Sequence, residues 1–375
     1  ALRRSLFLIS ASVVFITFAL PLRAEDLGAS AIQIGALYSL LTAAVFVMRP
    51  LSGYGLDALG RRPMFLAAAG AYFAANVLYA ASGDVIGLFA ARLMQGIGFA
   101  ILAIAADTIT ADIADQNQRS AAMGANIASQ TRGGMVGATF AFTLVGVAPL
   151  IAWVVSFWMF SVVSLLATVF VFFAIPETRP RRTAESGVAK KYVMPTGYVR
   201  VLVIIFLAAF AGALIQPYYL IYIRARFDVE LYMLATAFLP VGIAYAILPG
   251  VLGKAADRFS RVSAISVGLI IAASFYLLAP RVDGFFTLVG MFLGAAIGAV
   301  LVDLTKNAWV ADLSESAAVG RSFGLAALAA GGGGVLGPIA GGAIYDSIGP
   351  DYLFYGAALI LFAAALSTQI LFRTR

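Results

Sequence analysis

The sequence contains no cysteine and no histidine among its 375 residues, and these two absences narrow its chemistry. Without cysteine, the chain forms no disulfide and offers no thiolate nucleophile. Without histidine, it lacks the usual zinc ligand and the commonest catalytic base near neutral pH. No stretch resembles a soluble catalytic domain. We therefore expect no metal, no cofactor and no enzymatic activity.

Charged residues are also scarce, at 11% of the chain, whereas apolar residues make up 62%. A soluble domain of ordinary composition carries about a quarter charged residues. The chain has too little polar surface for water alone, so lipid must surround much of it. Its 37 glycines suit the close packing of helices inside a membrane.

Apolar runs follow one another along the whole chain, each close to the ~20 residues that cross a bilayer. We interpret the first run as a span rather than a cleaved signal peptide, because eleven more follow it. The sequence thus predicts an all-α integral membrane protein with twelve transmembrane helices. They lie at about 4–23, 30–52, 63–82, 84–112, 119–145, 148–175, 197–224, 231–252, 261–280, 284–311, 321–345 and 350–372.

The positions of lysine and arginine set the orientation. With both termini in the cytoplasm, most of the 25 lysines and arginines fall in cytoplasmic segments, as the positive-inside rule requires. The net charge of +7 is then a topology signal, and we expect no nucleic-acid partner. We expect a monomer in the cell inner membrane, surrounded by membrane lipid.

Several residues recur after a constant two hundred positions. The pairs are Gly53 and Gly253, Asp57 and Asp257, Arg61 and Arg261, Asp112 and Asp312, Gly124 and Gly324, and Gly137 and Gly337. Six predicted helices separate the partners, so both halves run in the same direction. Such repeats form two bundles related by a pseudo-twofold axis, with a cavity at mid-depth. We expect six-helix bundles at 1–175 and 197–375, joined by a charged, proline-containing cytoplasmic linker at 176–196.

Three segments carry a family resemblance. The loop expected after the second helix reads GYGLDALGRRP, Gly53 to Pro63, and its copy reads GKAADRFSR, Gly253 to Arg261, with Ser260 in place of Gly60. The fourth helix contains RLMQGIG, from Arg92 to Gly98. The whole chain resembles the major facilitator superfamily. The resemblance implies a secondary transporter that works by alternating access.

The subclass is less clear from the glycine-rich segments. The eleventh helix carries GGGGVLGPIAGG, Gly331 to Gly342, which resembles a segment that drug–proton antiporters of this family have on helix 5. Here helix 5 reads RGGMVGATF, Arg132 to Phe140, without proline. The chain therefore resembles the drug–proton antiporter branch with the subclass open. The glycine run indicates either a flexible helix or close packing alone.

The signature segment has a physical reading of its own. Gly53 would let two helices approach closely. Asp57 could pair with Arg61 or Arg62, or cap a neighbouring helix. The resemblance implies that this cluster locks a cytoplasmic gate; the alternative is a solvated topology anchor. The residues expected at the gate are Gly53, Asp57, Arg61, Arg62, Asp257, Arg258 and Arg261.

Ionisable residues inside spans are costly, so each is a functional hypothesis. The five are Arg92, Asp107, Arg132, Asp303 and Lys306. A rise of ~1.5 Å per residue places Arg132 and Asp303 near mid-depth. Lys306 follows Asp303 by three positions, so the two can pair. That pair either serves substrate or is a structural staple to a neighbouring helix.

The resemblance implies that helices 1, 4, 7 and 10 line the cavity. Proton coupling needs a carboxyl group that gains and loses a proton, which leaves Asp303 and Asp107 as candidates. Arg92 is expected to be structural or coupling. Tyrosines near Pro217 are either interfacial or part of an outer gate. The substrate-binding candidates are Arg132, Asp303, Lys306, Asn307, Gln216, Tyr219, Tyr38 and Asn126.

Two functions follow within the transporter class. The first is proton-coupled export of a lipophilic or amphipathic small molecule. The alternative is proton-coupled uptake or exchange of a small organic anion, which Arg132 and Lys306 favour because a desolvated anion needs a cationic partner. Outside the transporter class, the alternatives are an integral-membrane enzyme, a sensor that does not transport and a lipid scramblase.

Overall fold

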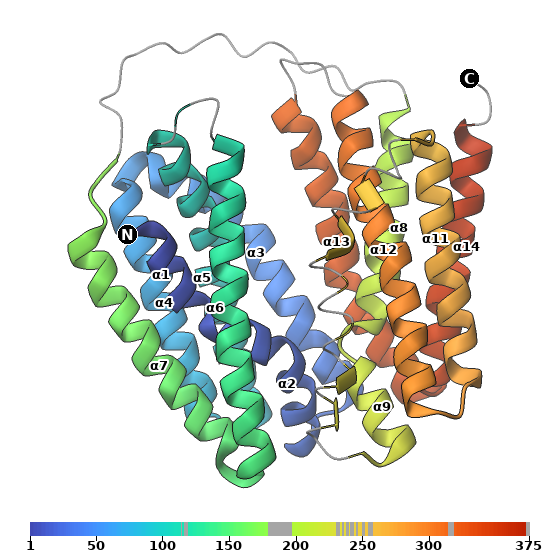
Figure 1. Ribbon diagram of the computed structural model, residues 1–375, viewed down its shortest axis with the longest axis horizontal. Helices are drawn as coiled ribbons and strands as arrows, with labels where there is room; N and C mark the ends of the chain where they lie inside the picture. Colours follow the sequence, from blue (N-terminus) through green and yellow to red (C-terminus); the bar gives the residue numbers. More distant parts are fainter. Residues whose placement is uncertain are drawn as a thin grey trace. The chain divides into compact units, whose positions relative to one another are not determined.

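The computed structural model describes most of the chain as long helices (Figure 1). The described residues are 1–113, 115, 119–178, 197–229, 233–234, 236–237, 240, 244, 247–249, 252–253, 258–313 and 319–372. Within these residues there is no strand. The predicted all-helical class is therefore confirmed.

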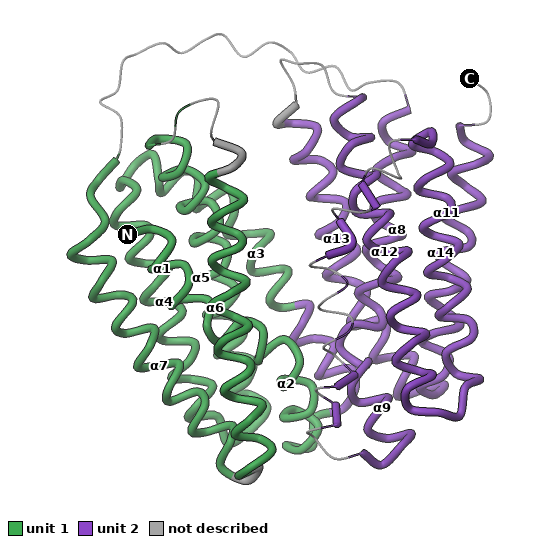
Figure 2. The backbone as a smooth tube through the Cα atoms, in the orientation of Figure 1, with its two compact units in different colours: residues 1–29, 40–187 green, residues 30–39, 188–375 purple. Residues whose placement is uncertain are grey.

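The chain forms two compact units (Figure 2). Unit 1 consists of residues 1–29 and 40–187, and unit 2 of residues 30–39 and 188–375. Residues 30–39, which include the first turns of α3, thus cluster with unit 2, whereas the rest of α3 belongs to unit 1. The helices in chain order are α1 (Leu2–Ile9), η1 (Ser10–Ser12), α2 (Val13–Asp26), α3 (Ala31–Leu59), α4 (Arg61–Ala81), α5 (Val85–Ile113), α6 (Arg119–Val147), α7 (Pro149–Ala174), α8 (Tyr198–Ile215), α9 (Tyr219–Phe227), α11 (Arg261–Leu278), η2 (Ala279–Arg281), α12 (Phe285–Leu313), α13 (Val319–Ser347) and α14 (Asp351–Phe372).

Ten candidate membrane spans lie within the described residues. Their helix ends agree with the sequence-based ranges to within a few residues, except that the second helix ends at Leu59 rather than near residue 52. The helix α6 is as long as its neighbours but more polar, and it is not among the ten. The predicted span at 231–252 falls largely outside the described residues. Twelve membrane helices therefore stay a prediction, whereas a multi-pass membrane protein is shown.

The segment expected to be a loop after the second span is mostly helical. The helix α3 continues through Pro50 to Leu59, so only Gly60 separates it from α4. The side chain of Leu56 is buried in the core of unit 1, which anchors this last part of the helix. The prediction of a loop from Gly53 onward was wrong, because the helical periodicity of the apolar residues extends past the membrane span.

Glycines bring α6 against the first helices of unit 1. A Cβ atom at Gly133 would lie 2.0 Å from the carbonyl oxygen of Phe7, and one at Gly137 would lie 2.0 Å from that of Ala11. These distances leave no room for a side chain, so the two backbones pack directly. The remaining core of unit 1 comes from α1, α3, α4, α5 and α7, with Phe65 and Leu102 among its buried residues.

The glycine run of α13 packs on α8 in the same way. Cβ atoms at Gly333, Gly337 and Gly341 would lie 2.7, 2.7 and 2.4 Å from backbone oxygen atoms of α8. A four-residue spacing places these glycines on one face of the helix. Close packing, one of the two readings of this segment, therefore accounts for the glycines, and α8, α11, α12, α13 and α14 stand side by side in unit 2 (Figure 1).

Candidate functional site

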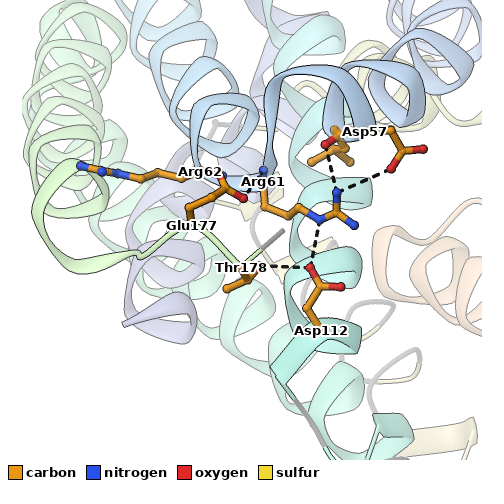
Figure 3. Close-up of polar contacts among 7 residues, drawn as sticks. Asp57, Arg61, Arg62, Asp112, Glu177 and Thr178 are labelled. Atoms are coloured by element: carbon orange, nitrogen blue, oxygen red, sulfur yellow. Dashed lines mark hydrogen bonds and ion pairs between the residues drawn. The ribbon is translucent and has the colours of Figure 1, made fainter. Parts of the chain in front are cut away.

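Arg61 forms the centre of a polar network at one end of unit 1 (Figure 3). Its Nε donates a hydrogen bond to Oδ2 of Asp112 at 2.9 Å, and its guanidinium also donates to the carbonyl oxygen of Leu56 at 3.1 Å. Both charged side chains are nearly buried, with exposed fractions of 10% and 13%. Asp57 lies 3.6 Å from the guanidinium, and its side chain is 81% exposed. Asp112 is therefore the principal partner of Arg61.

The N-terminus of α4 is capped by a residue from far along the chain. Glu177 accepts hydrogen bonds from the backbone N–H groups of Arg61 at 2.9 Å and Arg62 at 3.1 Å (Figure 3). A carboxylate here satisfies free donors and complements the helix dipole. Gly60 permits this arrangement, since its φ is +108° and a Cβ atom would lie 2.5 Å from Glu177. The Arg62 guanidinium contacts the carbonyl oxygen and ring of Phe172.

Sequence reasoning missed three members of this network, Asp112, Glu177 and Thr178. The Thr178 hydroxyl donates to Oδ2 of Asp112 at 3.1 Å. Glu177 and Thr178 belong to the segment expected to be a linker, whose remainder from 179 to 196 lies outside the described residues. The signal that could have found Asp112 is its repeat partner, Asp312.

Unit 2 contains a second copy of the central contact. The Nε atom of Arg261 donates to Oδ2 of Asp312 at 2.8 Å. Ser260 stands where Gly60 stands in the first copy, and its hydroxyl accepts from the backbone N–H of Ser263 at 3.2 Å. The serine thus caps α11 itself, which explains the departure from the first copy. Arg258 is exposed, and Asp257 lies outside the described residues.

Gly53 does not behave as expected. A Cβ atom on Gly53 would meet no described atom within 4 Å, so the close helix approach predicted there is not seen in the described part of the chain. The constrained glycine is Gly60 instead.

Arg92 belongs to a buried network in unit 1. Its exposed fraction is 2%, and its Nη1 donates to Oε1 of Gln95 at 2.8 Å. The Tyr79 hydroxyl donates to the same oxygen at 2.8 Å, and Trp153 donates to the Tyr79 carbonyl oxygen at 2.8 Å. These bonds connect α4, α5 and α7. The geometry favours the structural reading of Arg92.

Two expected substrate ligands are used inside their own units. The Asn126 amide is buried and donates to Oγ1 of Thr110 at 2.6 Å, which ties α6 to α5. The Tyr219 hydroxyl donates to the carbonyl oxygen of Ala237 at 2.6 Å. Tyr38 is buried in the segment that clusters with unit 2. The structure thus gives the Asn126 and Tyr219 side chains hydrogen-bond partners within their own units.

Four further candidates are exposed, three of them on helices and one between α8 and α9. Arg132 is the fourteenth of the 29 residues of α6, close to its midpoint, and its side chain has no hydrogen bond or ion pair among the described residues. Asp107 is exposed on α5, and Asn307 on α12. Gln216 is exposed where the seventh span breaks between α8 and α9.

Asp303 and Lys306 meet beside a cavity of about 180 Å³ within unit 2. The Lys306 ammonium forms an ion pair with Oδ1 of Asp303, as their spacing predicts. The Asp303 side chain is 51% exposed and that of Lys306 24%. Both residues belong to α12, so the pair does not staple this helix to a neighbour. The rest of the cavity wall is mostly small or apolar: Ala208, Ala209, Gly212, Leu269, Ala272, Tyr276, Ala299, Val302 and Leu361.

The chain is a multi-pass membrane protein with an internal repeat, since its helices are long and apolar and both copies contain the same Arg–Asp hydrogen bond. The ionisable groups inside its spans are typical of the transporter class. The chain belongs to the Major Facilitator Superfamily, whose sequence model matches residues 5–239 and 201–375. It is a secondary transporter of this type.

Curated relatives and solved structures agree with this membership. The human synaptic vesicular amine transporter is 24% identical over 350 residues, which cover 92% of this chain and 68% of the relative. The human vesicular acetylcholine transporter is 26% identical over 373 residues, covering 92% and 66%. The chain thus spans about two thirds of these relatives.

Two solved structures share the fold. A bacterial homolog of the human lysosomal transporter Spinster, in an inward-facing and occupied conformation, has a TM-score of 0.81 at 16% identity and covers 100% of this chain and 96% of its own. The human organic anion transporter MFSD10 has a TM-score of 0.68 at 20% identity, with 98% and 99% coverage. At these identities the likeness concerns the fold alone.

Proposed function

We propose that this protein is a proton-coupled antiporter that exports a lipophilic or amphipathic organic amine. The observation that carries the proposal is the Asp303 carboxylate beside a largely apolar cavity. An anionic group next to apolar walls suits a molecule with one cationic and one apolar end. Amines are also the substrates named for the vesicular relatives, and acetylcholine is another small organic cation.

The exchange follows from one shared carboxylate. Asp303 can hold a proton or pair with a substrate cation, and the two states exclude each other. If the protein alternates its access between the two sides of the membrane, Asp303 takes up a proton on the side where the amine leaves. It releases that proton on the other side when the next amine binds. Asp107, exposed on α5, is a second candidate for the proton. Both are carboxyl groups inside spans, where ionisable residues are retained for function.

The polar network around Arg61 is proposed as the cytoplasmic gate. The nearly buried Arg61–Asp112 bond is the fixed contact of this gate. Asp57 is exposed and can change its partner as the gate moves. The Arg261–Asp312 bond is the corresponding fixed contact in the second copy. The proposed gate also includes Arg62, Arg258 and Asp257, the last of which lies outside the described residues.

Uptake or exchange of a small organic anion is the second candidate. Arg132 supports it, because this exposed cation lies near the middle of α6 and has no ion pair among the described residues. A desolvated anion would need such a partner. Under this alternative, Lys306 would contribute a second positive charge.

The remaining assignments are also proposals. We place both termini in the cytoplasm, because lysine and arginine gather in the corresponding loops. We also propose that the protein is a monomer in the cell inner membrane. We propose no enzymatic activity. Twelve membrane helices follow if residues 231–252 form the span that their apolar run predicts.

Proteoliposomes containing the full chain test the two candidates directly. With an acidic lumen, a pH-sensitive dye trapped inside reports proton movement when an external compound is added. We expect phenethylamine to remove luminal protons faster than it does in protein-free liposomes, where the neutral amine enters passively, and sodium benzoate to cause no change beyond that in protein-free liposomes. Proton movement with benzoate and none with phenethylamine would replace the first candidate by the second.

A further inference from the structure

The cavity beside Asp303 has the size of a small ring. Its volume is about 180 Å³. Apolar cavities of about 150 Å³ are known to hold benzene. A single aromatic ring or a short branched chain therefore fills it.

The room exists because residues on several helices are small. Ala208 and Gly212 of α8 face Ala272 of α11 and Ala299 of α12 across the cavity. A Cβ atom at Gly212 would meet no described atom within 4 Å, so this position opens onto free space. Elsewhere in unit 2, glycines such as Gly333 are filled by a neighbouring backbone. Gly212 is thus open, in contrast to the glycines of α13 that pack on α8.

Lys306 occupies the place where a substrate ammonium would be expected. It is a primary ammonium in contact with the Asp303 carboxylate, and it lines the same cavity. The contact is between residues three apart on one helix, so breaking it separates no two helices. A lysine ammonium sits on a flexible stem of four carbons and can withdraw without any backbone movement.

We propose that Lys306 is a built-in competitor of the substrate. It neutralises Asp303 when neither a proton nor an amine occupies the site. A compact amine then displaces it, placing its own ammonium on Asp303 and its apolar part in the cavity. This inference rests on the proposed amine transport and narrows the substrate to amines with no more than about one ring.

The physical reason is the cost of a lone charge. The Asp303 carboxylate is half-exposed and lies beside apolar walls, so an adjacent cation stabilises it modestly. A tethered ammonium holds the empty site in a neutral state. It also sets the affinity, because the substrate must replace an existing ion pair rather than meet a free anion.

Equilibrium binding of radiolabelled phenethylamine to the full chain in lipid nanodiscs tests this proposal. We expect Lys306→Met to bind the amine about two- to fivefold more tightly than the wild type, the order expected for loss of one competing, partly exposed ion pair. Lys306→Arg keeps a competing cation and should bind like the wild type. Equal or weaker binding by Lys306→Met, with its elution profile unchanged, would overturn the proposal.

A second pair of variants tests the cavity. Gly212→Leu should lower phenethylamine affinity at least about tenfold while leaving methylamine binding unchanged, because only the ring needs the space. Gly290→Leu is the matched control, since Gly290 is also open but does not line the cavity. Equal losses of both amines in Gly212→Leu would contradict the assignment of the ring.

The same measurements separate the two levels of inference. Wild-type proteoliposomes that exchange protons for amine, together with an unchanged Lys306→Met affinity, would remove only the competitor role. Absence of amine binding in both the wild type and Lys306→Met would remove the proposed function and the competitor role together.

Discussion

Arg261 binds Asp312 through the same two atoms, Nε and Oδ2, that join Arg61 to Asp112 two hundred residues earlier, at 2.8 and 2.9 Å. The internal repeat therefore extends from sequence to side-chain geometry. In each unit the bond links the first residue of one helix, α4 or α11, to the last turn of another, α5 or α12. The arginine of the signature segment is thus fixed by a distant aspartate rather than by the aspartate four residues before it.

We expect Asp112→Asn to destabilise the protein by about 1–3 kcal/mol, because it leaves the Arg61 guanidinium nearly buried without its carboxylate. Asp57→Asn should cost less than about 0.5 kcal/mol, since Asp57 is exposed. Thermal unfolding followed by size-exclusion chromatography in detergent measures both. A larger loss for Asp57→Asn would show that the sequence-local pair is the principal one.

The packing of α6 on the first helices gives a second prediction. Gly137→Ala should destabilise unit 1 by about 1–3 kcal/mol, because the new methyl group would overlap the Ala11 carbonyl oxygen. Gly124→Ala on the same helix is the control, since a Cβ atom there meets no described atom within 4 Å. If both variants unfold at the wild-type temperature, the two helices do not pack as closely as described.

Asp346 caps the start of α3. Its carboxylate oxygens accept hydrogen bonds from the backbone N–H groups of Ala31 at 3.2 Å and Ile32 at 3.1 Å. Replacement by asparagine removes the charge that complements the helix N-terminus. We expect faster hydrogen–deuterium exchange in the peptide covering residues 30–39 of Asp346→Asn.

Ser30 and Gln33 provide the control for that experiment. They form a reciprocal capping pair with bonds of 2.9 and 3.3 Å, which Asp346→Asn leaves in place. Exchange should therefore rise at Ala31 and Ile32 without unfolding the whole first turn. An unchanged exchange rate in this peptide would show that Asp346 does not cap the helix in solution.

Much of the fold could be predicted from the sequence. Long apolar runs located most of the described helices to within a few residues, although α3 continues to Leu59. The spacing of two hundred between Arg61 and Arg261 exposed the repeat. The pairing of Asp303 with Lys306 also followed, because residues three apart share a helix face. These features depend on local periodicity, which a single sequence records.

Contacts between distant segments could not be predicted. Glu177 lies 116 positions from Arg61, and nothing in the composition of its charged segment indicates that it caps α4. Asn126 resembled a substrate ligand because it is polar inside a span, yet its partner Thr110 is on another helix. Which polar group meets which depends on helix packing, and packing is decided by the whole bundle.

Substrate-dependent proton movement in Asp303→Asn proteoliposomes is the most direct test of proton–amine exchange at this carboxylate. Asparagine has nearly the same shape but can neither bind a proton at this site nor pair with an ammonium. We expect the wild type to release luminal protons on addition of phenethylamine faster than protein-free liposomes lose them by passive entry of the neutral amine. Asp303→Asn should match the protein-free liposomes despite normal folding. Proton release by Asp303→Asn at the wild-type rate would contradict the exchange at Asp303.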